Sequence, residues 1–301
     1  MNFSVVLTNF NYGRYLGESV GSVLAQRLQP LELLVVDDGS TDESRARLAD
    51  LARGSPLIRV LHKENGGQAS AFMEGVAAAR GDIVAFLDAD DVWTEGYLER
   101  VAQVYASKQG VDFVYTGMQL FGEREGPFRL ADADRDLGLS VLHGAFNPQW
   151  QGSATSAITL KRDLARRVLD LPPGLVREWR TRADDCLVYG ADILGGHKYC
   201  IAEPLVRYRA HDNNVFLGQD RGHTAELGHQ YRRGRLLSHY RQVAGVTPAM
   251  LQFAKREFRT KQPTRQDLKR YLRLVDQAPL GWLTKLEHKL SMLRYYWSRR
   301  R

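Results

Sequence analysis

The sequence predicts an α/β fold with a mainly parallel, doubly wound sheet and a helical appendage at its C-terminal end. Short β-branched or apolar runs alternate with helical stretches over residues 3–87, and helices are the usual links between parallel strands. Three of these runs end directly in polar segments, and the sequence after residue 218 becomes arginine-rich and helical in pattern. The strands of this Rossmann-like sheet are expected at residues 3–7, 33–36, 57–61 and 83–87, and the helices near residues 15–24, 43–51 and 69–79.

The middle of the chain is less regular, and we expect the sheet to continue there in mixed form. The expected strands are residues 112–121, 157–160, 198–201 and 205–208; a loop covers residues 147–152, and helices begin near residues 163 and 184. After the boundary near residue 218, prolines at positions 248, 263 and 279 interrupt the helical pattern. The sequence therefore predicts one α/β domain over residues 1–218 and a basic helical region over residues 219–301.

Composition limits the class of protein. The 301 residues are 44% hydrophobic, which is enough to bury a substantial core. The net charge of +7 favours an anionic partner, but no nucleic-acid recognition motif accompanies it, so nucleic acid is not an expected partner. Two cysteines without a zinc signature are typical of a reducing compartment. With neither a basic leader nor an apolar run of about 18 residues, the chain is expected in the cytoplasm.

Acidic residues gather directly after the fourth predicted strand. Neighbouring carboxylates such as Asp88, Asp90 and Asp91 repel one another unless a cation or a proton neutralises them. Carboxylates at a strand end are hard oxygen ligands, which suit Mg²⁺ or Mn²⁺ bridging a diphosphate. The alternative is a solvated turn that caps the helix starting near Thr94.

A second acidic segment follows the second predicted strand. There Asp37 and Asp38 enter a glycine-containing turn, and a carboxylate in this place can accept a hydrogen bond from the imide N–H of uracil. For residues 40–42 we favour a turn that caps the next helix.

The order of these motifs resembles that of family 2 of the glycosyltransferases, which are inverting enzymes with a GT-A fold. The resemblance covers residues 3–215, and non-processive bacterial members are the nearest type. It implies a nucleotide-sugar half over about residues 1–110 and an acceptor half over about residues 111–218. The matching segments are residues 4–11 with 15–16 and 22–26, residues 35–42, residues 65–67 leading to 78–82, and residues 86–93.

The resemblance also implies roles for single residues. Thr8 and Phe10 would belong to the nucleotide pocket, although residues 8–11 stand where the family often has Pro-Thr-Tyr-Asn. Asp38 would contact the base, and Asp88 would lie near the ribose and the metal. Asp90 would be the main ligand of Mn²⁺ or Mg²⁺, and Ala89 would line the sugar-nucleotide site between them.

A third acidic pair begins the helix predicted near residue 184. It resembles the family's Glu-Asp pair, whose second member is the usual catalytic base, so the resemblance assigns this role to Asp185 with Asp184 as the fallback. The alternative is that both are ordinary acidic residues at a helix start. Residues 206–214 resemble the Tyr-Arg-x-His-x-x-Asn segment of non-processive members, which would bring His211 to the diphosphate or the metal. A lone histidine is as often structural.

Two tryptophans are candidates for acceptor binding. Trp150, in the poorly matched segment 147–155, and Trp179, just before the acidic pair, each have an indole face on which a sugar can stack. The alternative for both is an ordinary place in the core.

The C-terminal segment has apolar residues at helical spacing, together with a cationic face. One interpretation is a helix that lies on an anionic membrane surface, at the inner face of the cytoplasmic membrane. The other is a helix packed on its own domain with a solvated charged face. The apolar positions are Trp282, Leu283, Leu286, Leu290, Leu293 and Trp297, and the cations include Lys285, Lys289 and Arg294.

The resulting expectation is metal-dependent, inverting transfer of one sugar from a nucleotide-diphosphate sugar, a UDP-sugar above all, to a hydroxyl of a saccharide or lipid-linked acceptor. One alternative is a catalytically silent partner subunit of the same fold that binds nucleotide. Another is a sugar-phosphate nucleotidylyltransferase, which would need a glycine-rich basic loop after the first strand. Residues 8–13 do not supply such a loop.

Overall fold

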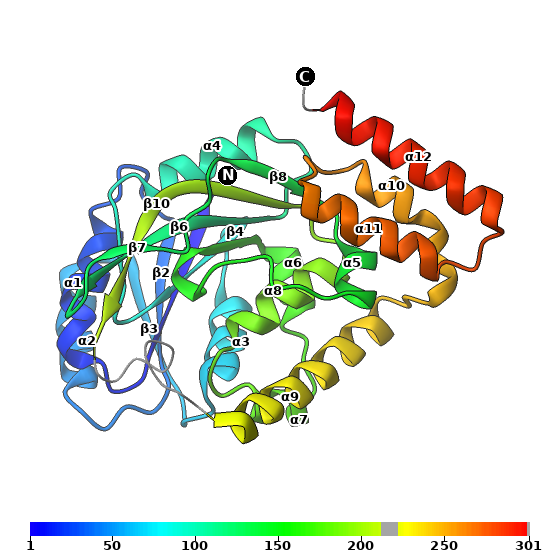
Figure 1. The fold of residues 1–301 in the computed structure, drawn as a ribbon. Helices are drawn as coiled ribbons and strands as arrows, with labels where there is room; N and C mark the ends of the chain where they lie inside the picture. The colour runs from blue at the N-terminus through cyan, green and yellow to red at the C-terminus, as the bar shows by residue number, and fades with distance from the viewer. Residues whose placement is uncertain (212–221, 300–301) are drawn as a thin grey trace.

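The computed structural model describes residues 1–211 and 222–299, and its centre is a mixed sheet with helices on both faces (Figure 1). Within these residues the sheet has the strand order β3-β2-β1-β4-β9-β6-β10-β5. Its first half is parallel, as the alternating pattern predicted. This half consists of β1 (Phe3–Asn9), β2 (Glu32–Asp37), β3 (Ile58–His62) and β4 (Ile83–Asp88), linked by α1 (Gly13–Leu24), α2 (Ser44–Gly54) and α3 (Gln68–Ala78).

The central strand β1 shows why apolar residues run continuously in this part of the chain. All seven of its residues are buried, because helices cover both faces of the sheet. Val5 and Leu7 belong to the core cluster that also contains Leu16 of α1, whereas Val6 points to the opposite face and joins the cluster that contains Phe72 of α3. The parallel strands are therefore held from both sides, and their carboxyl ends lie at one edge.

The second half of the sheet is mixed, as expected. Here β9 pairs antiparallel with both β4 and β6, and β6 runs parallel to β10. One long strand, β10, replaces the two expected at residues 198–201 and 205–208, and its register with β6 shifts on both sides of Pro204. Three short strands were not predicted. The elements are β5 (Val92–Trp93), β6 (Phe113–Gly122), β7 (Gly126–Phe128), β8 (Arg135–Gly138), β9 (Ile158–Lys161) and β10 (Lys198–Ala210).

Helices of the middle segment complete the layers. The helix expected near residue 184 begins at that residue as α8, which packs with α6 against the same core cluster as α3. The segment contains α4 (Tyr97–Ser107), α5 (Val141–Phe146), η1 (Thr155–Ala157), α6 (Arg162–Val168), α7 (Pro173–Glu178) and α8 (Asp184–Ile193).

The C-terminal region is helical, as predicted, although the expected boundary at residue 218 lies outside the described residues. Its first helix packs on α8, where the hydroxyl of Tyr240 donates to the carbonyl oxygens of Val168 and Cys186. The remaining helices share a separate core cluster with α5. The elements are α9 (Gly222–Val243), η2 (Pro248–Phe253), α10 (Ala254–Phe258), α11 (Arg265–Gln277) and α12 (Trp282–Ser298).

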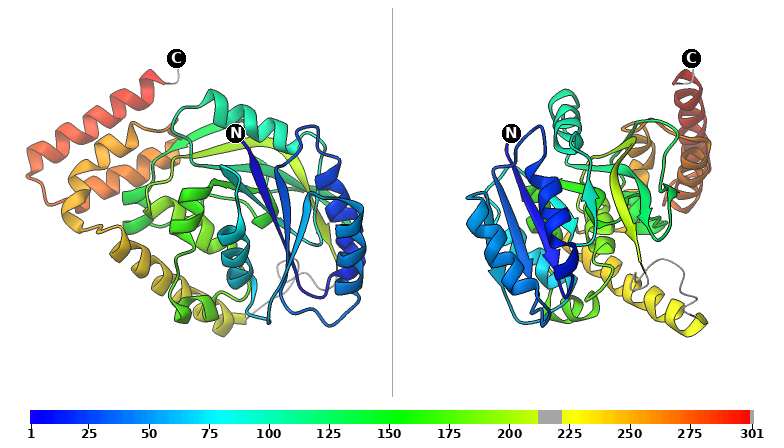
Figure 2. Two further views of the ribbon diagram at one scale, coloured as in Figure 1. Left: turned by 180° about the vertical axis from the view of Figure 1, so that it is seen from behind. Right: turned by 90° about the vertical axis from the view of Figure 1, so that its left-hand side faces the viewer.

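Two further views show α12 at the opposite end of the molecule from α1 and α2 (Figure 2). Among residues 1–211 and 222–299, no helix combines the length and the apolar character that a membrane span requires.

Candidate active site

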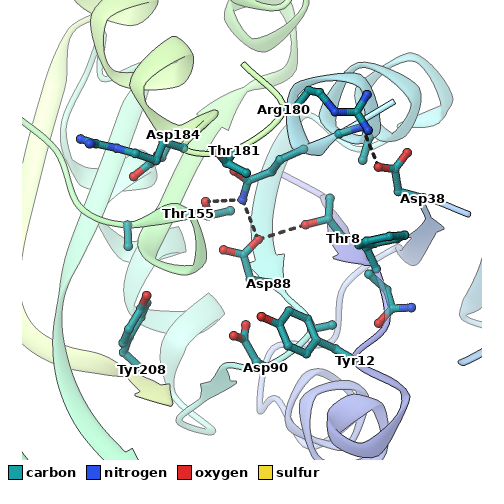
Figure 3. Close-up of a pocket in the computed structure, with 18 of the residues that line it drawn as sticks. Thr8, Tyr12, Asp38, Asp88, Asp90, Thr155, Arg180, Thr181, Asp184 and Tyr208 are labelled. Carbon is teal, nitrogen blue, oxygen red and sulfur yellow. Dashed lines mark hydrogen bonds between the residues drawn. The ribbon is translucent and has the colours of Figure 1, made fainter. Parts of the chain in front are cut away.

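A pocket opens at the carboxyl ends of the parallel strands, where the fold class places ligand sites (Figure 3). Residues after β1, β2 and β4 form one part of its wall, and residues that precede or begin α8 form another. The residues that line it include Thr8, Phe10, Tyr12, Asp38, Asn65, Gln68, Asp88, Ala89, Asp90, Phe128, Arg129, Thr155, Arg180, Thr181, Arg182, Asp184 and Tyr208.

The acidic residues at the end of β4 and in the turn after it have two different roles: one stabilises the fold, and two line the pocket. Asp91 is buried and serves the fold: its carboxylate accepts hydrogen bonds from the Ser156 hydroxyl at 2.6 Å and from the backbone N–H of Arg209 at 2.9 Å. Asp88 and Asp90 line the pocket instead. Asp88 accepts hydrogen bonds from the Thr8 hydroxyl at 3.0 Å and from Nε2 of Gln68 at 3.1 Å. Burial, and then the charge of Asp90, raises the pKa of Asp88 to about 7.

His211 meets the acidic turn from the end of β10. Its Nε2 lies 3.0 Å from a carboxylate oxygen of Asp90, and the rings of Tyr12 and Tyr15 pack against the imidazole. The neighbouring Arg209 donates from Nε to the backbone carbonyl of Asp90 at 2.8 Å. Although His211 does not line the pocket itself, it is held against a residue that does.

These side chains suit a divalent cation shared with a ligand. Among residues 1–211 and 222–299, no three His, Cys, Asp or Glu side chains are close enough together to hold a metal alone. Mg²⁺, however, is usually held by one or two carboxylates together with phosphate oxygens and waters. A cation at Asp90 would also relieve the repulsion that contributes to the raised pKa of Asp88. The residues present therefore fit a metal that arrives with a diphosphate.

The turn after β2 presents Asp38 to the pocket and keeps Asp37 in the core. Asp38 accepts hydrogen bonds from Nζ of Lys63 at 2.7 Å and from the backbone N–H groups of Gly66 and Gly67. Asp37 is fully buried and accepts a hydrogen bond from the Asn9 side chain. Further along, Asp42 accepts from the backbone N–H groups of Ser44 and Gly13, which agrees with the structural role favoured for residues 40–42.

A segment 110 residues downstream docks on the N-terminus of α3. The backbone N–H groups of Gln68 and Ala69 donate to the carbonyl oxygens of Arg180 and Trp179 at 2.8 and 3.2 Å. Gly67 adopts φ +87°, and a Cβ atom built on it would lie 2.5 Å from Cα of Arg180. Only glycine permits this approach, which carries residues 180–184 to the pocket.

The two carboxylates that begin α8 face different surroundings. Asp184 lines the pocket, and its charge is among the causes that raise the pKa of Asp88. Asp185 is not among the lining residues; its Oδ2 lies 3.3 Å from Nε2 of His229 and 3.9 Å from a guanidinium nitrogen of Arg182. Burial raises the pKa of Asp184, and burial together with the Asp184 charge raises that of Asp185 to about 7. The expected first choice for the base is therefore the more remote of the two.

Neither candidate tryptophan lines the pocket. Trp179 is 0% exposed and belongs to a core cluster, so the expectation that it stacks on a sugar is corrected: no face of its ring is accessible. Trp150 is partly buried and packs against the same cluster. The guanidinium of Arg129 lies over its ring at 4.5 Å, and Arg129 is the residue that reaches the pocket.

Several lining residues were missed from the sequence. Tyr12 and Gln68 directly follow the matched segments 4–11 and 65–67, so extending those segments by one residue would have found them. Arg129 directly follows β7 in the poorly matched middle, where no motif marks it. Tyr208 lies in β10 within the matched segment 206–214, so that motif could have pointed to it. Arg180 is brought in by the docking of its own backbone on α3.

The fold is that of the GT-A class. The chain is similar in structure to TarS of S. aureus, solved in complex with UDP-GlcNAc, with a TM-score of 0.55 and 15% identity over 99% of this chain and 73% of that one. It is also similar to the mannosyltransferase PcManGT of Pyrobaculum calidifontis, solved with GDP-Man and Mn²⁺, with a TM-score of 0.51 and 17% identity over 99% of this chain and 75% of that one.

Residues 4–164 match the Glycosyl transferase family 2 model, so the chain belongs to this family. It is 35% identical over 223 residues to an uncharacterized glycosyltransferase of Nostoc sp., covering 71% of this chain and 66% of that protein. It is 36% identical over 140 residues to glycosyltransferase GlyG of Streptococcus pneumoniae, covering 46% of each. The chain thus spans less than two thirds of the length of these relatives.

Proposed function

We propose that this glycosyltransferase is metal-dependent and inverting, and that it moves one sugar from a nucleotide-diphosphate sugar to an acceptor hydroxyl. The observation that carries the proposal is the shared pocket of Asp88, Asp90 and Asp184, which come from two segments far apart in sequence. An inverting displacement needs charge compensation on the leaving diphosphate and a base on the attacking hydroxyl. The pocket offers carboxylates for both tasks.

The nucleotide would bind against the ends of β1 and β2. Phe10 lines the pocket and is 46% exposed, so its ring has an open face on which a base can stack. Asp38 lies in the same wall, and Thr8 and Ala89 line the floor towards Asp88. Arg180, from the docked segment, adds a cation that suits a diphosphate.

Asp90 would be the main metal ligand, with Asp88 and His211 beside it. The 3.0 Å contact between Asp90 and His211 supports this grouping. A bound Mn²⁺ or Mg²⁺ would offset the negative charge that develops on the leaving diphosphate. Tyr12 and Arg209 would keep His211 and the backbone of Asp90 in place.

For the base we favour Asp184 over Asp185, because Asp184 lines the pocket and Asp185 contacts His229 instead. The acceptor oxygen would attack the anomeric carbon while the bond from that carbon to the diphosphate breaks, and Asp184 would take the hydroxyl proton. The raised pKa of Asp184 makes it a stronger base than an exposed aspartate.

The expected donor is a UDP-sugar. TarS binds UDP-GlcNAc and PcManGT binds GDP-Man, so this fold accommodates either nucleotide. The acceptor would be a saccharide or lipid-linked saccharide of the cell envelope, and the names of two relatives support this class: a putative teichuronic acid biosynthesis glycosyltransferase of Bacillus subtilis and an O-antigen biosynthesis protein of Myxococcus xanthus.

A thermal-shift and turnover screen tests the proposal. The purified chain is incubated with UDP-, GDP- and dTDP-sugars, with and without Mn²⁺, and both the unfolding midpoint and the release of nucleoside diphosphate are measured. We expect one donor to raise the midpoint only when metal is present, and to be slowly hydrolysed or transferred. Binding without release from any donor, with acceptors supplied, would favour the silent partner subunit instead.

A further inference from the structure

Helix α12 exposes a continuous apolar stripe that no described element covers. Trp282 is 73% exposed, Leu283 63%, Leu286 48%, Leu290 47% and Trp297 61%. Their spacing of three, four and seven residues places them on one side of the helix, whereas Leu293 is partly buried and packs against the core cluster of the C-terminal helices. Large apolar side chains gathered in this way mark a contact surface rather than scattered exposure.

The stripe is not the face by which α12 packs on the protein. The buried residues of the helix are Met292 and Tyr296, which join the core cluster shared with α10 and α11. At 100° per residue, Met292 and Tyr296 point well away from the direction shared by Leu286, Leu290 and Trp297. One side of α12 is therefore packed on its own domain, as one of the two interpretations expected, and another side remains open.

Positive charge surrounds the stripe. Lys285 and Lys289 lie on one flank, where both contact Asp276, and Arg294 lies on the other, near the Lys255–Glu287 pair. The excess of positive over negative charge extends to the whole C-terminal region. Residues 222–301 contain 18 Lys and Arg against 5 Asp and Glu, whereas residues 1–221 contain 24 against 30. The excess positive charge of the chain thus lies in the C-terminal region.

We propose that the α12 stripe (Trp282, Leu283, Leu286, Leu290 and Trp297) inserts into the surface of an anionic lipid bilayer, with the flanking cations against the headgroups. Apolar insertion and electrostatic attraction together give stable peripheral binding, where either alone is marginal. A second copy of this chain is the less suitable occupant, because a symmetric contact would bring the cations of both copies together. The proposal does not depend on the chemistry of the active site.

Vesicle binding by the full chain tests this directly. Co-sedimentation is measured with phosphatidylcholine vesicles that contain or lack phosphatidylglycerol, and at low and high salt. We expect binding to the anionic vesicles only, weakened by salt. Leu286→Glu should reduce it at least tenfold, and Lys285→Gln or Arg294→Gln about fivefold each.

Leu31→Glu is the matched control. Leu31 is a leucine that is 41% exposed on the catalytic part of the chain, and its substitution introduces the same charge as Leu286→Glu. It should leave vesicle binding unchanged. Equal binding by Leu286→Glu and the parent chain would overturn the proposal, as would the absence of binding to anionic vesicles. Light scattering provides the remaining outcome: a dimer that Leu286→Glu dissociates would identify a second copy as the occupant and also overturn it. Donor hydrolysis by the variants should be unchanged, which separates this test from that of the proposed function.

Discussion

Nε2 of His211 lies 3.0 Å from a carboxylate oxygen of Asp90, although 121 residues separate the two in the chain. The contact exists because β10 ends beside the turn that follows β4, where Arg209 also bonds to the backbone of Asp90. One acidic turn is thus supported by a strand from the other half of the sheet.

Replacing Asp90 should remove metal-dependent donor binding. Asp90→Ala deletes the proposed main ligand, so the donor should no longer raise the unfolding midpoint more in Mn²⁺ than without it. His211→Gln should show the same loss in weaker form. The measurement is the thermal shift by UDP-sugar with and without Mn²⁺. Asp50→Ala, on the exposed side of α2, is the control and should keep the full metal effect. An unchanged metal effect in Asp90→Ala would exclude Asp90 as the ligand.

Substitution of the two acidic residues that begin α8 should lower kcat to different extents. Asp184→Asn should lower kcat roughly 100- to 10,000-fold while donor binding persists, because it removes the proposed base. Asp185→Asn should lower kcat much less, since this carboxylate contacts His229 and does not line the pocket. Steady-state kinetics with isothermal titration of the donor makes the comparison. The reverse ranking would restore Asp185 as the base.

Activity should also depend on pH through the same residue. Burial raises the pKa of Asp184, and a general base acts only when deprotonated. The kcat of the parent chain should therefore fall as the pH drops, with a midpoint above the ordinary range of an aspartate. In Asp184→Asn this acid limb should disappear from the residual activity. Its persistence there would assign the limb to another group.

Phe10 and Trp179 should behave in opposite ways. Phe10→Ala should weaken donor binding roughly tenfold with little change in stability, because the ring lines the pocket and is half exposed. Trp179→Ala should cost about 3–5 kcal/mol of unfolding free energy, because the indole is fully buried. Chemical denaturation and donor titration measure both quantities. A stable Trp179→Ala variant with impaired acceptor use would return Trp179 to the binding site.

Gly67 should be intolerant of any side chain. Gly67→Ala places Cβ 2.5 Å from Cα of Arg180 at a φ of +87°, so we expect a loss of about 1–3 kcal/mol and displacement of the segment that carries Asp184. Gly17→Ala is the control: it lies inside α1 with no atom within 4 Å of the added Cβ, and should stabilise by about 0.5–1 kcal/mol. Equal stability of the two variants would show that the docking of Arg180 is dispensable.

Gln68 should act as a positioning residue between the two acidic sites. Its Nε2 donates to Asp88 and its Oε1 accepts from the backbone N–H of Ala183, next to Asp184. Gln68→Ala should therefore lower kcat for transfer more than it weakens donor binding, and raise the ratio of donor hydrolysis to transfer. Gln68→Met, which keeps the size of the side chain without its hydrogen bonds, should show the same change if the bonds are responsible. A normal ratio in both variants would contradict this role.

The local sequence pattern was sufficient to predict the strands and helices of the parallel half of the fold. In β1 to β4 the apolar runs, the helices between them and the polar strand ends all follow from near-neighbour sequence, and parallel strands necessarily bring their carboxyl ends to one edge. The positions of Thr8, Phe10, Asp38, Asp88 and Asp90 at the pocket were predictable for this reason. Their individual roles rested on resemblance to the family and stay predictions.

The surroundings of side chains that are set by contacts between distant residues could not be predicted from local sequence. The sequence showed two acidic residues at the start of α8, but the docking of residues 179 and 180 on α3 decided that Asp184 and not Asp185 lines the pocket. The same docking buries Trp179, and packing on α10 and α11 decides which side of α12 stays open. The sequence by itself determined the strands and helices of the parallel half, and where charge and apolar residues lie along the chain. Tertiary structure decided which side chains share a pocket, because that depends on contacts between residues more than a hundred positions apart.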